Sequence, residues 1–110
     1  MPTAAPRSAE RDPGEQAPRR AARATVSSAA LRHNLRRARE LAPASRVMAV
    51  IKANAYGHGL VGTARALREA DAFAVARMEE AVALREAALD NPIVLLEGVL
   101  DAQQLPLAAA

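Results

Sequence analysis

The sequence lacks cysteine entirely and has few aromatic residues, with one Tyr, one Phe and no Trp among 110 residues. Without cysteine, disulfide bonds, a thiol nucleophile and a thiolate zinc site are all excluded, which suits a cytoplasmic protein. The two histidines, His33 and His58, do not have the spacing of metal ligands, so no metal site is expected. An aromatic content of 2% provides little volume for a self-sufficient core, which suggests a part of a larger structure.

Long apolar runs and a strongly basic face are also missing. No segment approaches the roughly 18 apolar residues of a membrane-spanning helix, and the N-terminus lacks the apolar core of a secretory signal. The net charge is +3, of which residues 1–23 contribute +2 through five Arg and three acidic residues. The remainder is close to neutral, so neither a membrane nor a nucleic-acid partner is expected.

The N-terminal segment has the composition of a disordered tail. Residues 1–23 contain no Val, Ile, Leu, Phe, Tyr or Trp, and they hold four of the seven prolines. Such a segment cannot bury enough apolar surface to offset the entropy of ordering its backbone. We therefore expect a disordered tail over residues 1–23 and a folded domain over residues 24–110.

The folded part predicts alternating strands and helices joined by short connections. Strands are expected at 25–26, 46–52, 72–76 and 93–96, and helices at 29–41 (capped by Ser27 or Ser28), at 60–69, at 78–89 and after Asp101. The apolar, partly β-branched run at 46–52 is typical of a strand that is buried on both faces. This alternation indicates an α/β fold with a parallel sheet. A closed (β/α)8 TIM barrel needs about 250 residues, and this chain has material for roughly three of its eight strands, or about three βα units.

Lys52 is the main candidate for chemistry. It is the only lysine among the 15 Lys and Arg residues. A lysine amine can lose its proton and attack a carbonyl carbon, which a guanidinium cannot do usefully. Strand alternation places Met48, Val50 and Lys52 on one face, with Lys52 at the carboxyl end, where barrel enzymes have their active sites. A strand-end lysine that merely reaches water is the commoner case for an arbitrary protein, and the residues alone do not exclude it.

The segment KANAYGHG, residues 52–59, resembles the cofactor-lysine signature of alanine racemases. Eight specified positions in a row at the end of a strand make this a specific match. The resemblance covers about residues 24–107 and includes ALRHNL (30–35), ELAPAS (40–45), DAFAVARMEEAVALR (71–85) and PIVLLEG (92–98).

The resemblance implies a role for three residues. Lys52 would bind pyridoxal 5'-phosphate covalently and act as the base that handles the α-proton of D-alanine. The hydroxyl of Tyr56, the only tyrosine, would reach the cofactor phosphate, and Leu96 would lie near the cofactor ring.

For four other polar residues near these segments we expect structural roles. Asn54 and His58 are expected to support the loop through hydrogen bonds, and Glu79 and Glu80 to form a solvated helix face.

The implied activity is the interconversion of L-alanine and D-alanine, which supplies D-alanine for peptidoglycan, by a cytoplasmic homodimer. The second base would be a downstream tyrosine supplied by the partner subunit. Because the chain has no second tyrosine, we expect an N-terminal fragment that is inactive alone. The alternatives are a broader-specificity racemase or a pyridoxal-phosphate-carrying protein on the same barrel, and a non-enzymatic fragment that binds no cofactor.

Overall fold

The computed structural model describes residues 22–110. The predicted disordered tail lies outside the described residues, apart from Ala22 and Arg23. Residues 22–27 are exposed and contain neither helix nor strand, so the strand expected at 25–26 is not formed. The sheet that the structure describes has three strands, and none of them pairs with this segment.

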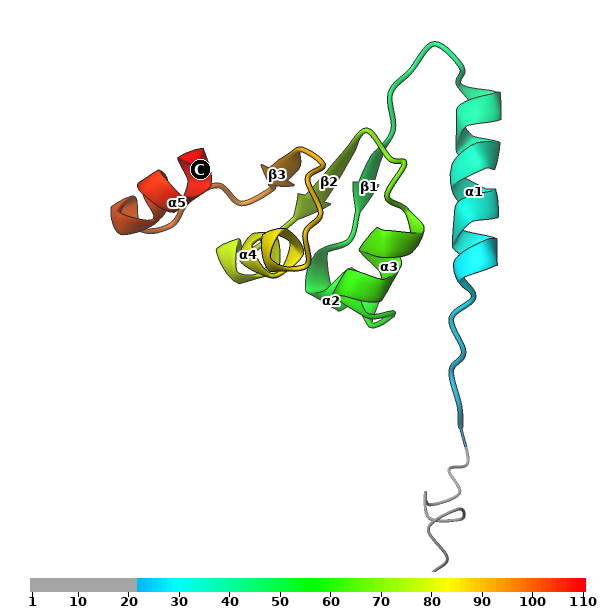
Figure 1. Ribbon diagram of the computed structural model, residues 1–110, viewed down its shortest axis with the longest axis horizontal. Coiled ribbons are helices and arrows are strands. Elements are labelled where there is room, and N and C mark those ends of the chain that lie inside the picture. Colours follow the sequence, from blue (N-terminus) through cyan, green and yellow to red (C-terminus); the bar gives the residue numbers. More distant parts are fainter. Residues whose placement is uncertain (1–21) are drawn as a thin grey trace, which may run out of the picture.

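Helices and parallel strands alternate along the chain, as the sequence predicts. The elements are α1 (Ser28–Leu41), β1 (Met48–Val50), α2 (Lys52–Tyr56), α3 (Leu60–Ala66), β2 (Ala72–Val75), α4 (Met78–Glu86), β3 (Ile93–Leu95), the 3₁₀ helix η3 (Ala102–Gln104) and α5 (Leu105–Ala109). The strands form one parallel sheet in the order β1-β2-β3 (Figure 1). The α/β expectation is therefore confirmed.

The ends of the elements follow from local chemistry. Ser27 is the N-cap of α1, because its hydroxyl oxygen accepts a hydrogen bond from the amide of Ala30 at 3.1 Å. Asp101 caps η3 in the same way, accepting from the amide of Gln103 at 2.9 Å. α4 is shorter than expected because Ala88 adopts a positive φ of 65°, which a right-handed helix cannot continue through.

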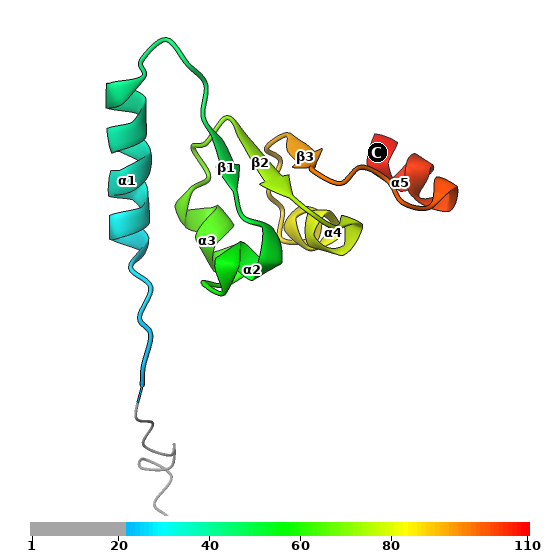
Figure 2. The same cartoon turned by 180° about the vertical axis from the view of Figure 1, so that it is seen from behind.

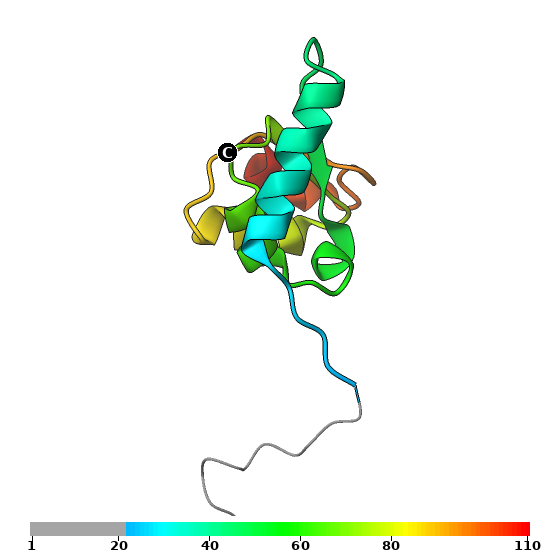
Figure 3. The ribbon, with the colours of Figure 1, turned by 90° about the vertical axis from the view of Figure 1, so that its right-hand side faces the viewer.

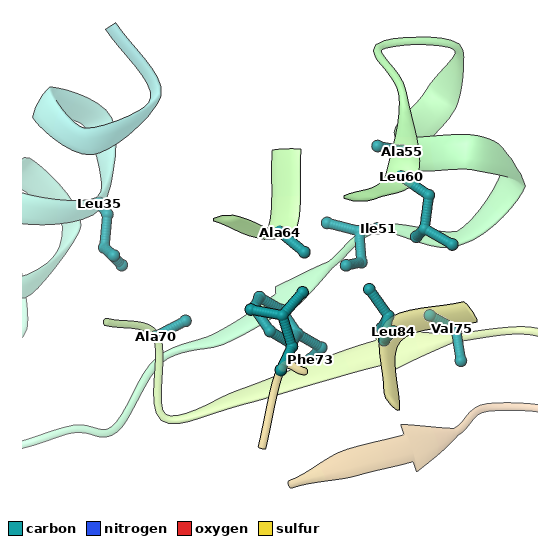
Figure 4. Close-up of a cluster of buried hydrophobic side chains, with 10 residues drawn as sticks. Leu35, Ile51, Ala55, Leu60, Ala64, Ala70, Phe73, Val75 and Leu84 are labelled. Carbon is teal, nitrogen blue, oxygen red and sulfur yellow. The ribbon is translucent and has the colours of Figure 1, made fainter. Parts of the chain in front are cut away.

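The core lies on one face of the sheet. Figures 1 and 2 show α2, α3 and α4 grouped on this side. The largest fully buried side chains are Phe73 and Val75 of β2 and Leu84 of α4 (Figure 4). Their neighbours in the same cluster are Leu35, Ile51, Ala55, Leu60, Ala64, Ala70 and Leu89.

The other face of the sheet is open. Met48 and Val50 of β1 are 45% and 40% exposed, and Val94 and Leu96 at β3 are 41% and 45% exposed. The prediction that residues 46–52 are buried on both faces is therefore wrong for this chain, because within residues 22–110 helices cover only one side of the sheet. Strand alternation puts these four apolar side chains together, and we call them the open face.

α1 stands at one end of the sheet and packs on α3, with Leu35 as its buried residue (Figure 3). Its far end is tied to the sheet by Asp71, whose Oδ2 accepts from the amide of Val47 at 2.6 Å and from Nη1 of Arg39 at 3.3 Å. The hydrogen bond from Val47, followed by the charge of Arg39, holds the pKa of Asp71 below its ordinary value of 3.8, although desolvation opposes them. Within residues 22–110, no helix has the length and apolar character needed to cross a membrane.

Candidate functional site at the carboxyl edge of the sheet

Lys52 lies where β1 ends. The amide of Ile51 donates to the carbonyl oxygen of Ala74 at 2.9 Å, which extends the pairing with β2 by one residue. Ile51 is 2% exposed and anchors the chain in the core, whereas Lys52 is half-buried. The lysine is thus presented at the carboxyl edge of a parallel sheet, which is the edge where α/β proteins bind ligands.

An unexpected left-handed turn follows Lys52. The four residues Ala53, Asn54, Ala55 and Tyr56 have φ angles between 53° and 56°, and Gly57 follows at 91°. For L-residues this conformation costs about 1–2 kcal/mol per residue, or about 4–8 kcal/mol for the four. The surrounding contacts must compensate for this cost.

Several hydrogen bonds fix the turn and the loop after it. The Oδ1 atom of Asn54 accepts from the amide of Leu60 at 2.8 Å, at the start of α3. The ring Nδ1 of His58 is 3.0 Å from the carbonyl oxygen of Ala55, whose side chain is buried. The expectation that Asn54 and His58 support the loop is confirmed.

Glu80 contributes a third set of contacts, which the sequence analysis missed. Its Oε2 accepts from the amide of Asn54 at 3.2 Å, and its Oε1 accepts from the amides of Ala76 at 3.1 Å and Arg77 at 3.2 Å. The prediction of a solvated side chain is wrong for Glu80, although Glu79 is exposed. Desolvation raises the pKa of Glu80, but the backbone hydrogen bonds outweigh it and hold the pKa below its ordinary value of 4.5.

The other two predicted site residues lie at the same edge. Leu96 follows β3, where its amide donates to the carbonyl oxygen of Val75 at 2.8 Å. Lys52 follows β1 and Leu96 follows β3, which are the two outer strands of the sheet, so their backbones are separated by roughly 10 Å, or two strand spacings. Tyr56 ends the left-handed turn with its side chain 60% exposed. Lys52 and Leu96 therefore lie at the same edge of the sheet, and Tyr56 shares the lysine's loop.

The residues present suit a carbonyl compound that carries an anionic group. Within residues 22–110, Lys52 forms no salt bridge, so its amine is not paired with a carboxylate. The exposed hydroxyl of Tyr56 can donate a hydrogen bond to an anion. Gly57 and Gly59 have open space around them, so atoms of a ligand can approach the loop backbone. Pyridoxal phosphate has both groups, an aldehyde and a phosphate, and thus fits this donor set.

Consecutive parallel βα units, with a lysine at the carboxyl edge of their sheet, are the arrangement found in part of an α/β barrel. The family model for the alanine racemase N-terminal domain matches residues 26–110. The chain therefore belongs to the alanine racemase N-terminal domain family.

Individual relatives agree with this family assignment. The biosynthetic alanine racemase of Escherichia coli (strain K12) is 59% identical over 90 residues, which cover 82% of this chain and 25% of that protein. The structure of alanine racemase from Acinetobacter baumannii superposes with a TM-score of 0.71 at 41% identity, covering 74% of this chain and 23% of the other. For the biosynthetic enzyme of Pseudomonas aeruginosa the TM-score is 0.68 at 46% identity, covering 73% and 23%. The chain spans about a quarter of the length of these relatives, and its βα units correspond to the N-terminal portion of their barrel.

Proposed function

We propose that this chain provides the cofactor-binding lysine of a pyridoxal-phosphate-dependent alanine racemase. The observation that carries the proposal is the position of the only lysine, half-buried at the carboxyl end of β1, in a chain of the alanine racemase family. Because the chain corresponds to about a quarter of its relatives, the activity is proposed for the whole protein, and residues 24–110 contribute one part of its site.

The three side chains at this edge have different proposed roles, each set by its chemistry. Pyridoxal phosphate, when bound, supplies an electron sink that allows the α-carbon of an amino acid to lose its proton. The amine of Lys52 would hold the cofactor covalently and move the α-proton on the face used by D-alanine, since a neutral amine is both nucleophile and base. The hydroxyl of Tyr56 would donate to the phosphate, and Leu96 would pack near the ring.

Racemisation also requires a proton-transferring group on the opposite face of the substrate. Tyr56 is the only tyrosine of the chain and is assigned to the phosphate, so the proposal assigns this second group to none of the 110 residues. We propose that it comes from the partner subunit of a homodimer, from a part of the protein that this chain does not include.

Exchange of the α-proton in heavy water tests the proposal. The holoenzyme should exchange the α-proton of both alanine enantiomers, and Lys52→Arg should slow exchange from D-alanine by about 10²-fold or more, the usual contribution of an acid–base group. Arg46→Lys, a change at an exposed position before β1, is the matched control and should exchange normally. Normal exchange in Lys52→Arg would refute the role of Lys52. Equal exchange with several other amino acids would favour a racemase of broader specificity.

A further inference from the structure

The carboxylate of Glu80 joins the two loops that border the proposed site. Asn54, whose amide donates to Oε2, lies in the left-handed turn directly after Lys52. Ala76 and Arg77, whose amides donate to Oε1, form the connection between β2 and α4. One side chain on α4 therefore fixes the carboxyl ends of two adjacent strands relative to each other.

We propose that Glu80 is a positioning residue for Lys52, because it holds the left-handed turn that sets the course of the chain after the lysine. The proposal rests on the proposed function of Lys52. L-residues disfavour this turn, and Ala53 and Ala55 belong to the residue type with the strongest preference for a right-handed helix. A right-handed path would leave the sheet in another direction and would lose the hydrogen bond between Asn54 and Glu80.

The geometry requires a carboxylate rather than any acceptor. Two oxygens serve the two loops, and hydrogen bonds to an ionised acceptor are stronger than those between neutral groups. The side chain of Gln has one acceptor oxygen and can serve one loop only. Glu79 offers a matched control, because it is the preceding residue, carries the same charge in the first turn of α4 and is exposed to solvent.

Glu80 also satisfies the N-terminus of α4 through its bond from Arg77, and a role limited to capping that helix makes a different prediction. Loss of a cap alone would loosen the first turn of α4. Loss of a bridge would also loosen residues 53–57, which belong to the other loop and are distant in sequence. Hydrogen exchange separates these two results without any cofactor.

The first measurement is amide hydrogen exchange of the cofactor-free protein, followed by mass spectrometry. In Glu80→Gln, the amides of residues 53–57 should exchange about ten-fold faster or more, as expected when a hydrogen bond to a charged group is lost. Glu79→Gln should leave the exchange of these residues unchanged. Faster exchange confined to α4 in both Glu80→Gln and Glu80→Ala, or equal effects of Glu80→Gln and Glu79→Gln, would overturn the proposal.

The second measurement uses the holoenzyme and the circular dichroism of the bound cofactor's visible band, which reports how the cofactor is oriented. Glu80→Gln should weaken this signal and release the cofactor about ten-fold faster, whereas Glu79→Gln should not. A normal signal and a normal release rate in Glu80→Gln would overturn the proposal. Glu80→Gln can be measured even if Glu80→Ala fails to fold. Lys52→Arg is measured in parallel. If it retains a covalently bound cofactor, the proposed function fails, whereas a silent Glu80→Gln beside a defective Lys52→Arg removes only the positioning role.

Discussion

Replacing Ala53 with glycine should stabilise the protein, which is the opposite of the usual effect of Ala→Gly. Ala53 has a φ of 53° and is exposed, so its methyl group contributes strain but no burial. Glycine adopts positive φ without a steric penalty, so the substitution removes about 1–2 kcal/mol of strain. It also costs about 0.5–1 kcal/mol, because glycine gains more backbone freedom than alanine in the unfolded chain. With the middle of each range, the expected net gain is about 0.75 kcal/mol in the free energy of unfolding.

Ala38→Gly provides the matched control. Ala38 is also exposed, but it lies in the right-handed helix α1, so its replacement should cost about 1 kcal/mol. The same chemical change should therefore differ by about 1.5–2 kcal/mol and in sign between the two positions.

Urea denaturation measures both values, provided that the slope of the transition does not change. The midpoint should rise for Ala53→Gly and fall for Ala38→Gly. Equal decreases for the two variants would refute the reasoning, because they would mean that residue 53 gains nothing from glycine and that the turn is not left-handed in solution.

Three further predictions concern the sheet and its supports. The stabilisation provided by Asp71 should be complete above its ordinary pKa of 3.8 and should be lost as the pH falls through its lowered pKa. In Asp71→Asn the free energy of unfolding should therefore depend less on pH in the acid range. An unchanged pH dependence in acid denaturation would contradict this. Leu84→Ala should cost about 2–5 kcal/mol in thermal unfolding, because Leu84 is fully buried, and a loss below 1 kcal/mol would indicate a loosely packed core. Residues 1–110 prepared alone should self-associate and bind a hydrophobic dye through the open face, including Val50 and Val94; a dye-free monomer in light scattering would contradict this.

The sequence was sufficient to predict the parallel βα arrangement and the position of Lys52 at the end of β1. Apolar runs bounded by Gly57 and Pro92 identify strands by themselves, because pattern and turn residues agree locally. Burial of both faces of residues 46–52 was not borne out in this chain, since that prediction assumes covering elements on each side of the sheet. Within residues 22–110 no helix covers the open face, so Met48 and Val50 of β1 remain exposed.

The left-handed turn could not be predicted, because Ala53 and Ala55 carry no local signal for positive φ. The turn depends on contacts with distant residues, above all Glu80, which lies 26 positions beyond Asn54. One signal for Glu80 was available: a Glu three residues after the N-cap of a helix often bonds back to the N-cap amide. Arg77 at the N-cap position obscured it, because the usual Ser, Thr, Asp or Asn is absent there.

The central claim is that Lys52 carries the cofactor, and borohydride trapping tests it most directly. Borohydride converts a reversible link between an amine and an aldehyde into a stable bond, and peptide mapping then locates the label. The holoenzyme should carry the label on the peptide that contains Lys52. The double variant Lys52→Arg with Arg65→Lys, which keeps one lysine within these 110 residues but moves it to an exposed position on α3, should carry no label in this part of the protein. A label at any other position in the unaltered protein, or no label at all, would contradict the account.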